Sequence, residues 1–258
     1  MRGFLVAAAG LGALLLTSPV SAADLAARPY TKAPAPMVAA VYDWSGFYIG
    51  LNGGGGSSHN CWDLTSNNGV ALANTPREGC HDATGGLVGG QFGYRWQSAA
   101  WVFGLEAQGD WANLSGSSLS NPLALGALAT NRSKIDAIYL LTGQVGYAVN
   151  NVLFYVKGGA MGVNDKFEGF TTATGVVFDS ARQTRWGGAI GAGLDYGITP
   201  NIVLGVDYMH GFMGCKDTSL YAVAGGAFSR TDRICQDVDM VTARLSYKFG
   251  GSAIVAKY

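Results

Sequence analysis

The sequence predicts an all-β fold, an eight-stranded antiparallel up-and-down transmembrane β-barrel, on the basis of three observations. Hydrophobic residues make up 48% of the 258 residues and charged residues only 13%, about half the usual charged share of a globular domain. Eight segments alternate between apolar and polar residues with the period of two that is typical of β-strands. Short turns and long polar connections alternate between these segments, as they do in membrane barrels.

The first residues predict export. Arg2 precedes an apolar stretch from Phe4 to Leu16, and small residues follow up to Ala22, where signal peptidase needs them. An uncleaved membrane helix is the alternative, but this stretch is shorter than the ~20 residues that a helix needs to cross a bilayer. We therefore assign residues 1–22 to a signal peptide that is cleaved after Ala22.

Residues 23–43 are predicted to form an extended linker. They contain the runs Ala26-Ala27-Arg28-Pro29 and Ala33-Pro34-Ala35-Pro36 and show no hydrophobic periodicity. A long loop of the fold is the alternative. The alternating pattern begins at Trp44, so the barrel is assigned to residues 44–250 and a short C-terminal extension to residues 251–258. No later segment has 18 consecutive apolar residues, so strands must make any further membrane contact.

The eight predicted strands are similar in length to the ~9 to 11 residues that a tilted membrane strand needs. In chain order they are Gly46–Gly55, Gly85–Gln97, Trp101–Trp111, Lys134–Val149, Val152–Asn164, Arg185–Gly197, Ile202–His210 and Val238–Phe249. In the third, Trp101 and Leu105 share one face, while Glu106 and Asp110 share the other. The last three segments repeat this division, and the remaining four complete the set.

The connections differ in length from one end of the predicted barrel to the other. Three are tight turns, at Ser98–Ala100, Asn150–Asn151 and Thr199–Asn201. Four are expected to be long polar loops, at Ser57–Ala83, Ser115–Ser133, Phe167–Gln183 and Phe212–Asp237. Closing the hairpins around the turns also predicts register. The expected pairs are Gln144 with Lys157, Tyr147 with Phe154, Tyr196 with Leu204, Leu194 with Val206, and Gln91 with Glu106.

The apolar face is expected to point outward into lipid. A soluble lipocalin-like barrel is the alternative and would show the same alternation turned inside out. Several glycines, including Gly93, Gly104 and Gly193, share the charged face, and a narrow eight-stranded interior needs such space for buried charges. Aromatic residues near the strand ends, such as Trp101 and Tyr247, are typical of the girdles at membrane interfaces.

Both ends of the predicted barrel resemble a known family. The run from Asp43 to Gly54, DWSGFYIGLNGG, and the closing run from Val241 to Gly250, VTARLSYKFG, resemble the alphaproteobacterial small outer-membrane proteins of the RopB and outer-membrane immunogenic protein family. That family is similar in fold to the OmpA transmembrane barrel. The resemblance covers Trp44 to Gly250 and implies an eight-stranded barrel in a Gram-negative outer membrane, with extracellular long loops, periplasmic termini and linker, and no known catalysis.

The chain departs from this family at its C-terminus. Many members end on the aromatic residue that the barrel-insertion machinery reads, whereas here Gly251–Lys257 follow Phe249. The insertion signal is therefore expected to be either Phe249, read internally, or Tyr258.

The inferred lumen carries a balanced set of charges. Its members are Arg95, Lys157, Arg185, Arg244 and Lys248 against Glu106, Asp110, Asp136, Asp195 and Asp207. Buried charges are tolerated only when paired, so this set predicts a plug of salt bridges, with Glu106 and Arg244 as the central pair. The alternative is that several of these residues lie unpaired at the wet rims. A pore lined by one sign of charge would favour ion selectivity, and this balance does not.

Four cysteines lie in two of the predicted loops: Cys61 and Cys80 in the first, and Cys215 and Cys235 in the fourth. Export favours disulfide bonds, and four cysteines allow three pairings. Local pairing within each loop is the preferred prediction. Pairing between the loops is also possible, because the last strand must close on the first.

No catalytic, cofactor or metal site is predicted. A zinc site at His59, Cys61, Cys80 and His81 matches no standard ligand spacing. His210 lies three residues beyond Asp207, hence on the opposite face, and is expected to be a rim histidine without a partner. With 17 basic and 17 acidic residues the chain has no net charge, which argues against nucleic-acid binding.

Three functions fit these observations. The first is a non-catalytic structural protein of the envelope that displays surface loops. The second is a small passive porin, and the third is an adhesin or surface antigen that binds a partner through its loops. The expected partners are outer-membrane lipid, lipopolysaccharide and the insertion machinery. We expect a monomer, while contact with a host or with peptidoglycan stays open.

Overall fold

The computed structural model describes residues 42–121 and 129–250. The predicted signal peptide, the linker up to residue 41 and the extension at 251–258 lie outside the described residues. Within the described residues, no helix is long and apolar enough to cross a membrane.

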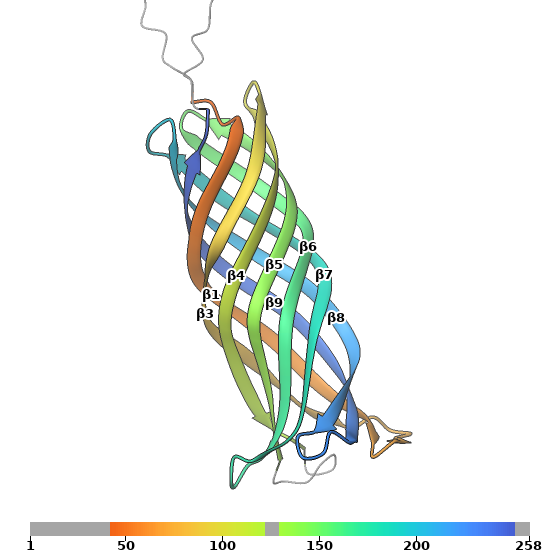
Figure 1. Ribbon diagram of the computed structural model, residues 1–258. Helices are drawn as coiled ribbons and strands as arrows, with labels where there is room; N and C mark the ends of the chain where they lie inside the picture. Colours follow the sequence, from red (N-terminus) through yellow and green to blue (C-terminus); the bar gives the residue numbers. More distant parts are fainter. Residues whose placement is uncertain (1–41, 122–128, 251–258) are drawn as a thin grey trace, which may run out of the picture. The chain divides into compact units, whose positions relative to one another are not determined.

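One antiparallel sheet closes on itself to form the barrel (Figure 1). Its long strands are β1 (Gly46–Asn67), β3 (Arg77–Ser98), β4 (Trp101–Leu119), β5 (Ala129–Val149), β6 (Val152–Thr171), β7 (Val177–Gly197), β8 (Ile202–Ala222) and β9 (Phe228–Lys248). Each pairs with the next along the chain, and β9 pairs back onto β1. The short β2 (Val70–Ala71) pairs only with the end of β1 in the described residues. The predicted eight-stranded up-and-down barrel is therefore confirmed.

The strands are about twice as long as predicted, because the four predicted long loops are mostly strand. β1 continues through Asn67 and β3 already begins at Arg77, so only a short excursion with β2 separates them. Alternation continues through these segments, but the outward residues there are polar. The contrast between apolar and polar faces is then lost, and the segments look like loops in the sequence.

The tight turns set the register of the hairpins. Four of the five predicted pairs are found, on either side of the β5–β6 and β7–β8 turns. The prediction for the β3–β4 hairpin was wrong by two residues, since Gln91 faces Gln108 and Glu106 faces Gly93. Ser98 pairs with Trp101, so the turn shrinks to two residues, with Ala99 at a φ of 54°. A shift of two residues leaves every side chain on its predicted face.

The outward face of the barrel divides into two zones. Nearer to Tyr42 and Phe249 it carries a belt of exposed apolar side chains, which we call the apolar belt. Aromatic residues border the belt at both edges; they include Trp96, Trp101, Tyr147 and Tyr247 at one edge and Trp111, Tyr139, Trp186 and Tyr208 at the other. Beyond the second edge most outward residues are polar, although Leu119, Tyr221 and Phe228 are exposed. We call this second zone the distal extension: residues 57–67, 77–84, 113–119, 129–136, 164–171, 177–184, 214–222 and 228–239.

Candidate functional site

Four charged side chains meet in the lumen and form the centre of the candidate site. We call Glu106, Lys157, Asp207 and Arg244 the ion quartet. Lys157 Nζ lies 3.2 Å from Glu106 Oε1, and Arg244 Nη1 lies 3.0 Å from Asp207 Oδ2. Arg244 also contacts Glu106, and Lys157 contacts Asp207. Each cation therefore touches both anions, and the quartet carries no net charge although its side chains are at most 1% exposed.

Hydroxyl groups that sequence reasoning missed complete this network. The Tyr48 hydroxyl donates to Glu106 Oε2 at 2.7 Å, and Arg244 Nη1 donates to the Tyr155 hydroxyl at 3.2 Å. Both tyrosines lie over glycines of a neighbouring strand, where a Cβ on Gly93 or Gly193 would collide with the ring. The glycines on the charged face thus make room for large polar side chains. Alternation around Phe47 could have revealed Tyr48 as a lumen residue.

A second ion pair lies closer to Tyr42 and Phe249. Arg95 Nη2 donates to Asp195 Oδ2 at 2.6 Å, and the guanidinium stands over the Tyr48 ring, 4.6 Å from its centroid. Here the lumen is closed by an apolar cluster of Trp44, Val102, Leu153, Tyr155 and Val203. Lys248 has no carboxylate partner among the described residues. Its Nζ donates instead to the Asp43 carbonyl and lies over the Tyr42 ring.

Like Lys248, two of the predicted acidic lumen residues are not part of an ion network inside the barrel. Asp110 is buried in the lumen, but it accepts a hydrogen bond from Gln108 Nε2 at 2.9 Å and forms no ion pair within the described residues. Asp136 points outward and pairs with Lys134 at 3.0 Å. A register irregularity between Ile135 and Ala137 reverses which residues of β5 face the lumen. The assignment of Asp136 to the lumen was therefore wrong.

An apolar layer, which the sequence did not predict, fills the lumen next to the ion quartet on its distal side. Met161, Met209 and Met240 lie on the same strands as Lys157, Asp207 and Arg244 and are at most 1% exposed. They pack with Leu87, Leu114, Ile135, Ile138, Leu140, Val163, Met213 and Val238. Flexible methionine side chains suit such an irregular interior. The lumen is thus closed by hydrophobic packing as well as by ion pairs.

The distal extension has its own buried charges. Arg185, which directly follows the 177–184 segment of this zone, lies 3.8 Å from Asp165 and donates to the Ile234 carbonyl at 2.9 Å. Nearby, Trp62, Phe167, Leu220 and Ile234 form a third apolar cluster.

Arg230 is the centre of a further buried cluster, which sequence reasoning missed because it lay in predicted loops. It donates to both oxygens of Glu78, to Asp179 and to Asn131 at 2.8 to 2.9 Å, and lies 3.5 Å from Asp232. One cation thus faces three carboxylates. Burial, opposed in part by Arg230, raises the pKa of Asp232, which lies beyond the apolar belt. The alternation of Arg230, Asp232 and Ile234 could have revealed this cluster.

The cysteines pair locally, as Cys61–Cys80 and Cys215–Cys235. They join β1 to β3 and β8 to β9, between residues that are direct partners in the sheet. Cys61 is also the register partner of Cys235. All four cysteines therefore lie in one row across four adjacent strands, and the two bonds flank the seam between β1 and β9.

Two of the three histidines pair with carboxylates on the outward face. His210 was expected to have no partner, but its Nδ1 lies 2.7 Å from Asp239 Oδ1. Asp239 is the register partner of His210 on β9. Alternation along β8 gives the face of His210 but cannot identify a partner on a neighbouring strand. His59 Nδ1 lies 2.6 Å from Asp82 Oδ1. His81 is buried between the hydroxyls of Ser118 and Ser133, and burial lowers its pKa to about 4.

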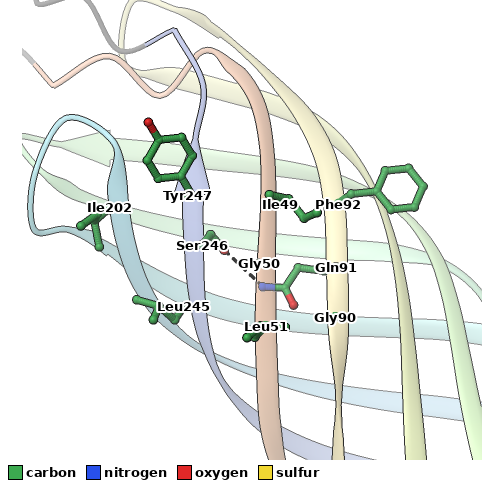
Figure 2. Close-up of a pocket in the computed structure, with 10 residues that line it drawn as sticks. All are labelled: Ile49, Gly50, Leu51, Gly90, Gln91, Phe92, Ile202, Leu245, Ser246 and Tyr247. Carbon is green, nitrogen blue, oxygen red and sulfur yellow. Dashed lines mark hydrogen bonds between the residues drawn. The ribbon is translucent and has the colours of Figure 1, made fainter.

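An apolar hollow of about 600 Å³ lies on the outward wall, across β1, β3 and β9 and beside the start of β8 (Figure 2). Its walls are Ile49, Leu51, Phe92, Ile202, Leu245 and Tyr247, and its floor includes Gly50 and Gly90. Figure 2 also shows the hydrogen bond from Gln91 to Ser246, 3.2 Å long, which crosses the lumen side of these strands. Because the hollow lies within the apolar belt and offers few polar groups, it suits hydrocarbon rather than a polar substrate.

Comparisons with known proteins agree with this architecture. The model of the outer membrane protein beta-barrel domain family matches residues 12–249. The chain is 28% identical over 222 residues to the 31 kDa outer-membrane immunogenic proteins of Brucella melitensis biotype 1 and Brucella suis biovar 1, covering 81% of this chain and 87% of each relative. The outer membrane protease OmpT of Escherichia coli superimposes with a TM-score of 0.50 at 12% identity, covering 79% of this chain and 97% of OmpT. At that identity the likeness concerns the fold alone.

Proposed function

Because the chain belongs to the outer membrane protein beta-barrel domain family, we propose that it is a non-catalytic structural protein of the outer membrane, closed to ions, that displays its distal extension at the cell surface. Its location is the outer membrane of a Gram-negative bacterium. The ion quartet carries the proposal, because it places two balanced pairs of buried charges across the lumen. A conducting pore would need water at these groups.

The histidines support a non-catalytic role. Hydrolysis needs an activated nucleophile or water beside a base, at a place that substrate can reach. His81 does contact Ser133 Oγ at 3.0 Å and Ser118 Oγ at 3.1 Å, but the His81 ring and Ser133 are buried, so substrate does not reach the base. His59 and His210 pair with carboxylates on the outward wall, without a hydroxyl nucleophile of serine or threonine bonded to either ring in the described part of the chain.

Surface display is supported by the polar outward face of the distal extension and by its two disulfides. The Brucella relatives are named as immunogenic, which suits a protein that antibodies can reach. A rigid barrel rim that projects beyond the apolar belt would present such a surface.

Planar-bilayer conductance tests the closed lumen. We expect the purified, heat-modifiable protein to be silent, with a general porin as the positive control in the same membrane. The double variant Glu106→Ala with Arg244→Ala removes one cation and one anion of the quartet together. Lys157 and Asp207 remain as an ion pair without net charge. This variant should also stay silent, because apolar layers lie on both sides of it.

The matched control is Lys166→Ala with Glu168→Ala. This variant also removes one cation and one carboxylate that form an ion pair, but from the outward wall. Steady conductance of the wild-type protein would overturn the proposal and make the chain a small porin. A leak in the lumen variant alone would show that the ion quartet, rather than the stacked layers, closes the barrel.

A further inference from the structure

Three cations lie side by side on the outward wall of the distal extension. Lys134 on β5 is the register partner of Lys166 on β6, which is in turn the partner of Arg182 on β7. Alternation places Lys134 and Lys166 outward, because their neighbours Ile135, Asp165 and Phe167 are buried, and Arg182 is itself exposed. We call Lys134, Lys166 and Arg182 the cationic row. Like charges directly opposite each other on neighbouring strands are destabilising, so this arrangement calls for an anion.

The nearby carboxylates do not neutralise the row. Asp136 pairs with Lys134 at 3.0 Å, and Glu168 pairs with Lys166 at 2.5 Å and with Arg132 at 3.6 Å. Arg182 is exposed and forms no ion pair with any described residue. Four cations, counting Arg132, therefore share two carboxylates. These six side chains carry a net charge of about +2, and Arg182 is the member of the row without an ion-pair partner among the described residues.

The row lies just beyond the aromatic edge of the apolar belt. One pleat closer to the belt, Thr184 donates to Asn164 at 2.7 Å, and Asn164 donates to the Tyr139 hydroxyl at 3.2 Å. Trp186 follows Thr184 on the outward face of β7 and is 62% exposed. Exposed tryptophan and tyrosine mark the headgroup level of a membrane. The cationic row thus lies at the height of lipid headgroups or just above them.

The charge on the wall differs around the barrel at this height. The outward residues on β3 and β9 include Asp82, Asp237 and Asp239 instead of cations. A polar hollow of about 480 Å³ lies beside the cationic row, lined by Asp136, Asn164, Asp165, Arg182, Gln183 and Thr184. Amide and hydroxyl groups beside an unpaired guanidinium are suited to hydrogen-bond phosphate oxygens.

We propose that the cationic row binds the phosphate groups of an anionic glycolipid in the leaflet on the distal side of the membrane. The Arg182 guanidinium would donate hydrogen bonds to two oxygens of one phosphate. Lys134 and Lys166 would supply further positive charge. The lipid chains would lie along the apolar belt below. The assignment of this leaflet to the cell surface rests on the proposed function, whereas the binding itself does not.

Binding can be measured on the full mature protein in detergent by native mass spectrometry. The probes are a bisphosphorylated glucosamine lipid, the same lipid without phosphates, and inorganic phosphate. We expect the wild-type protein to retain the bisphosphorylated lipid. The variant Lys134→Gln/Lys166→Gln/Arg182→Gln should bind it about tenfold more weakly, since charge-assisted hydrogen bonds are lost.

The control variant, Arg77→Gln/Lys216→Gln/Arg233→Gln, removes the same charge from other strands of the distal extension and should bind as the wild type does. Heat-modifiable mobility verifies folding of each variant. If the triple variant does not fold, Arg182→Gln alone tests the same site, because it breaks no ion pair, and it should also weaken binding.

Three outcomes would overturn the inference: equal retention of the lipid without phosphates, displacement of the lipid by inorganic phosphate at equal concentration, or equal loss in both triple variants. None of these outcomes affects the closed lumen. Conversely, a conducting barrel would overturn the proposed function and leave this binding result unchanged.

Discussion

Glu106 accepts contacts from Lys157, Arg244 and Tyr48 inside the lumen. Taking a charge out of water is costly, and only its partners offset that cost. The quartet resolves this with two cations and two anions, each touching both opposite charges. A single substitution therefore leaves its partners with an uncompensated buried charge, whereas removal of one cation and one anion together keeps the net charge of the quartet at zero.

This leads to a prediction on non-additivity. Glu106→Ala should lower the free energy of unfolding by ~3–5 kcal/mol, because it leaves two cations facing one buried carboxylate. Glu106→Ala with Arg244→Ala should cost less than the sum of the two single changes. Urea unfolding in detergent micelles, followed by tryptophan fluorescence, measures all three variants. Additive losses would mean that the two side chains act independently.

At the scale of elements, we expect disulfide bonds rather than contact with lipid to stabilise the strands of the distal extension. Its outward residues are polar, and β7 and β8 have no paired residues between Ser180 and Gly188 in the described register. The disulfides close loops with sequence separations of 19 and 20 residues. Each bond joins strands that already pair, so it limits opening of the rim without changing the barrel.

We therefore expect the disulfides to protect the rim selectively. Replacing both cysteines of either pair by serine should cost ~2–4 kcal/mol and expose the distal extension to protease. The part of the barrel within the apolar belt should stay protected and heat-modifiable. Limited proteolysis with mass mapping of the fragments separates the two regions. The two double variants serve as controls for each other, and unchanged cleavage in both would remove this role.

For the whole molecule, the two ends of the barrel differ in kind. The end near Tyr42 and Phe249 has tight turns next to an aromatic edge of the apolar belt, whereas the other end projects as the distal extension (Figure 1). In an outer-membrane barrel, short turns belong to the periplasmic side. This asymmetry predicts which end reaches the cell surface.

Labelling of intact cells tests this orientation. A membrane-impermeant maleimide should modify Ala173→Cys, in the β6–β7 connection of the distal end, without lysis. Pro200→Cys, in the β7–β8 turn, should react only after the outer membrane is permeabilised. Both positions are exposed, and the native cysteines are held in disulfides. The reverse pattern would invert the barrel and contradict surface display.

Local alternation was enough to predict strands, faces and most hairpin registers, because a strand places successive side chains on opposite sides whatever surrounds it. The apolar belt follows from that rule, and so does the inward placement of every predicted lumen charge except Asp136. Within the distal extension the rule still held, but polar outward residues hid it.

Contacts across the lumen were decided only by the tertiary structure. Which cation meets Glu106, and which carboxylate meets His210, depends on how far the strands are staggered when β9 closes on β1. The irregularity at Asp136 reversed a face, and the apolar layer beside the ion quartet formed from residues of all the long strands except β1. The sequence by itself determined what each strand presents to either side, and barrel closure decided which of those side chains meet, because stagger is a property of the closed sheet.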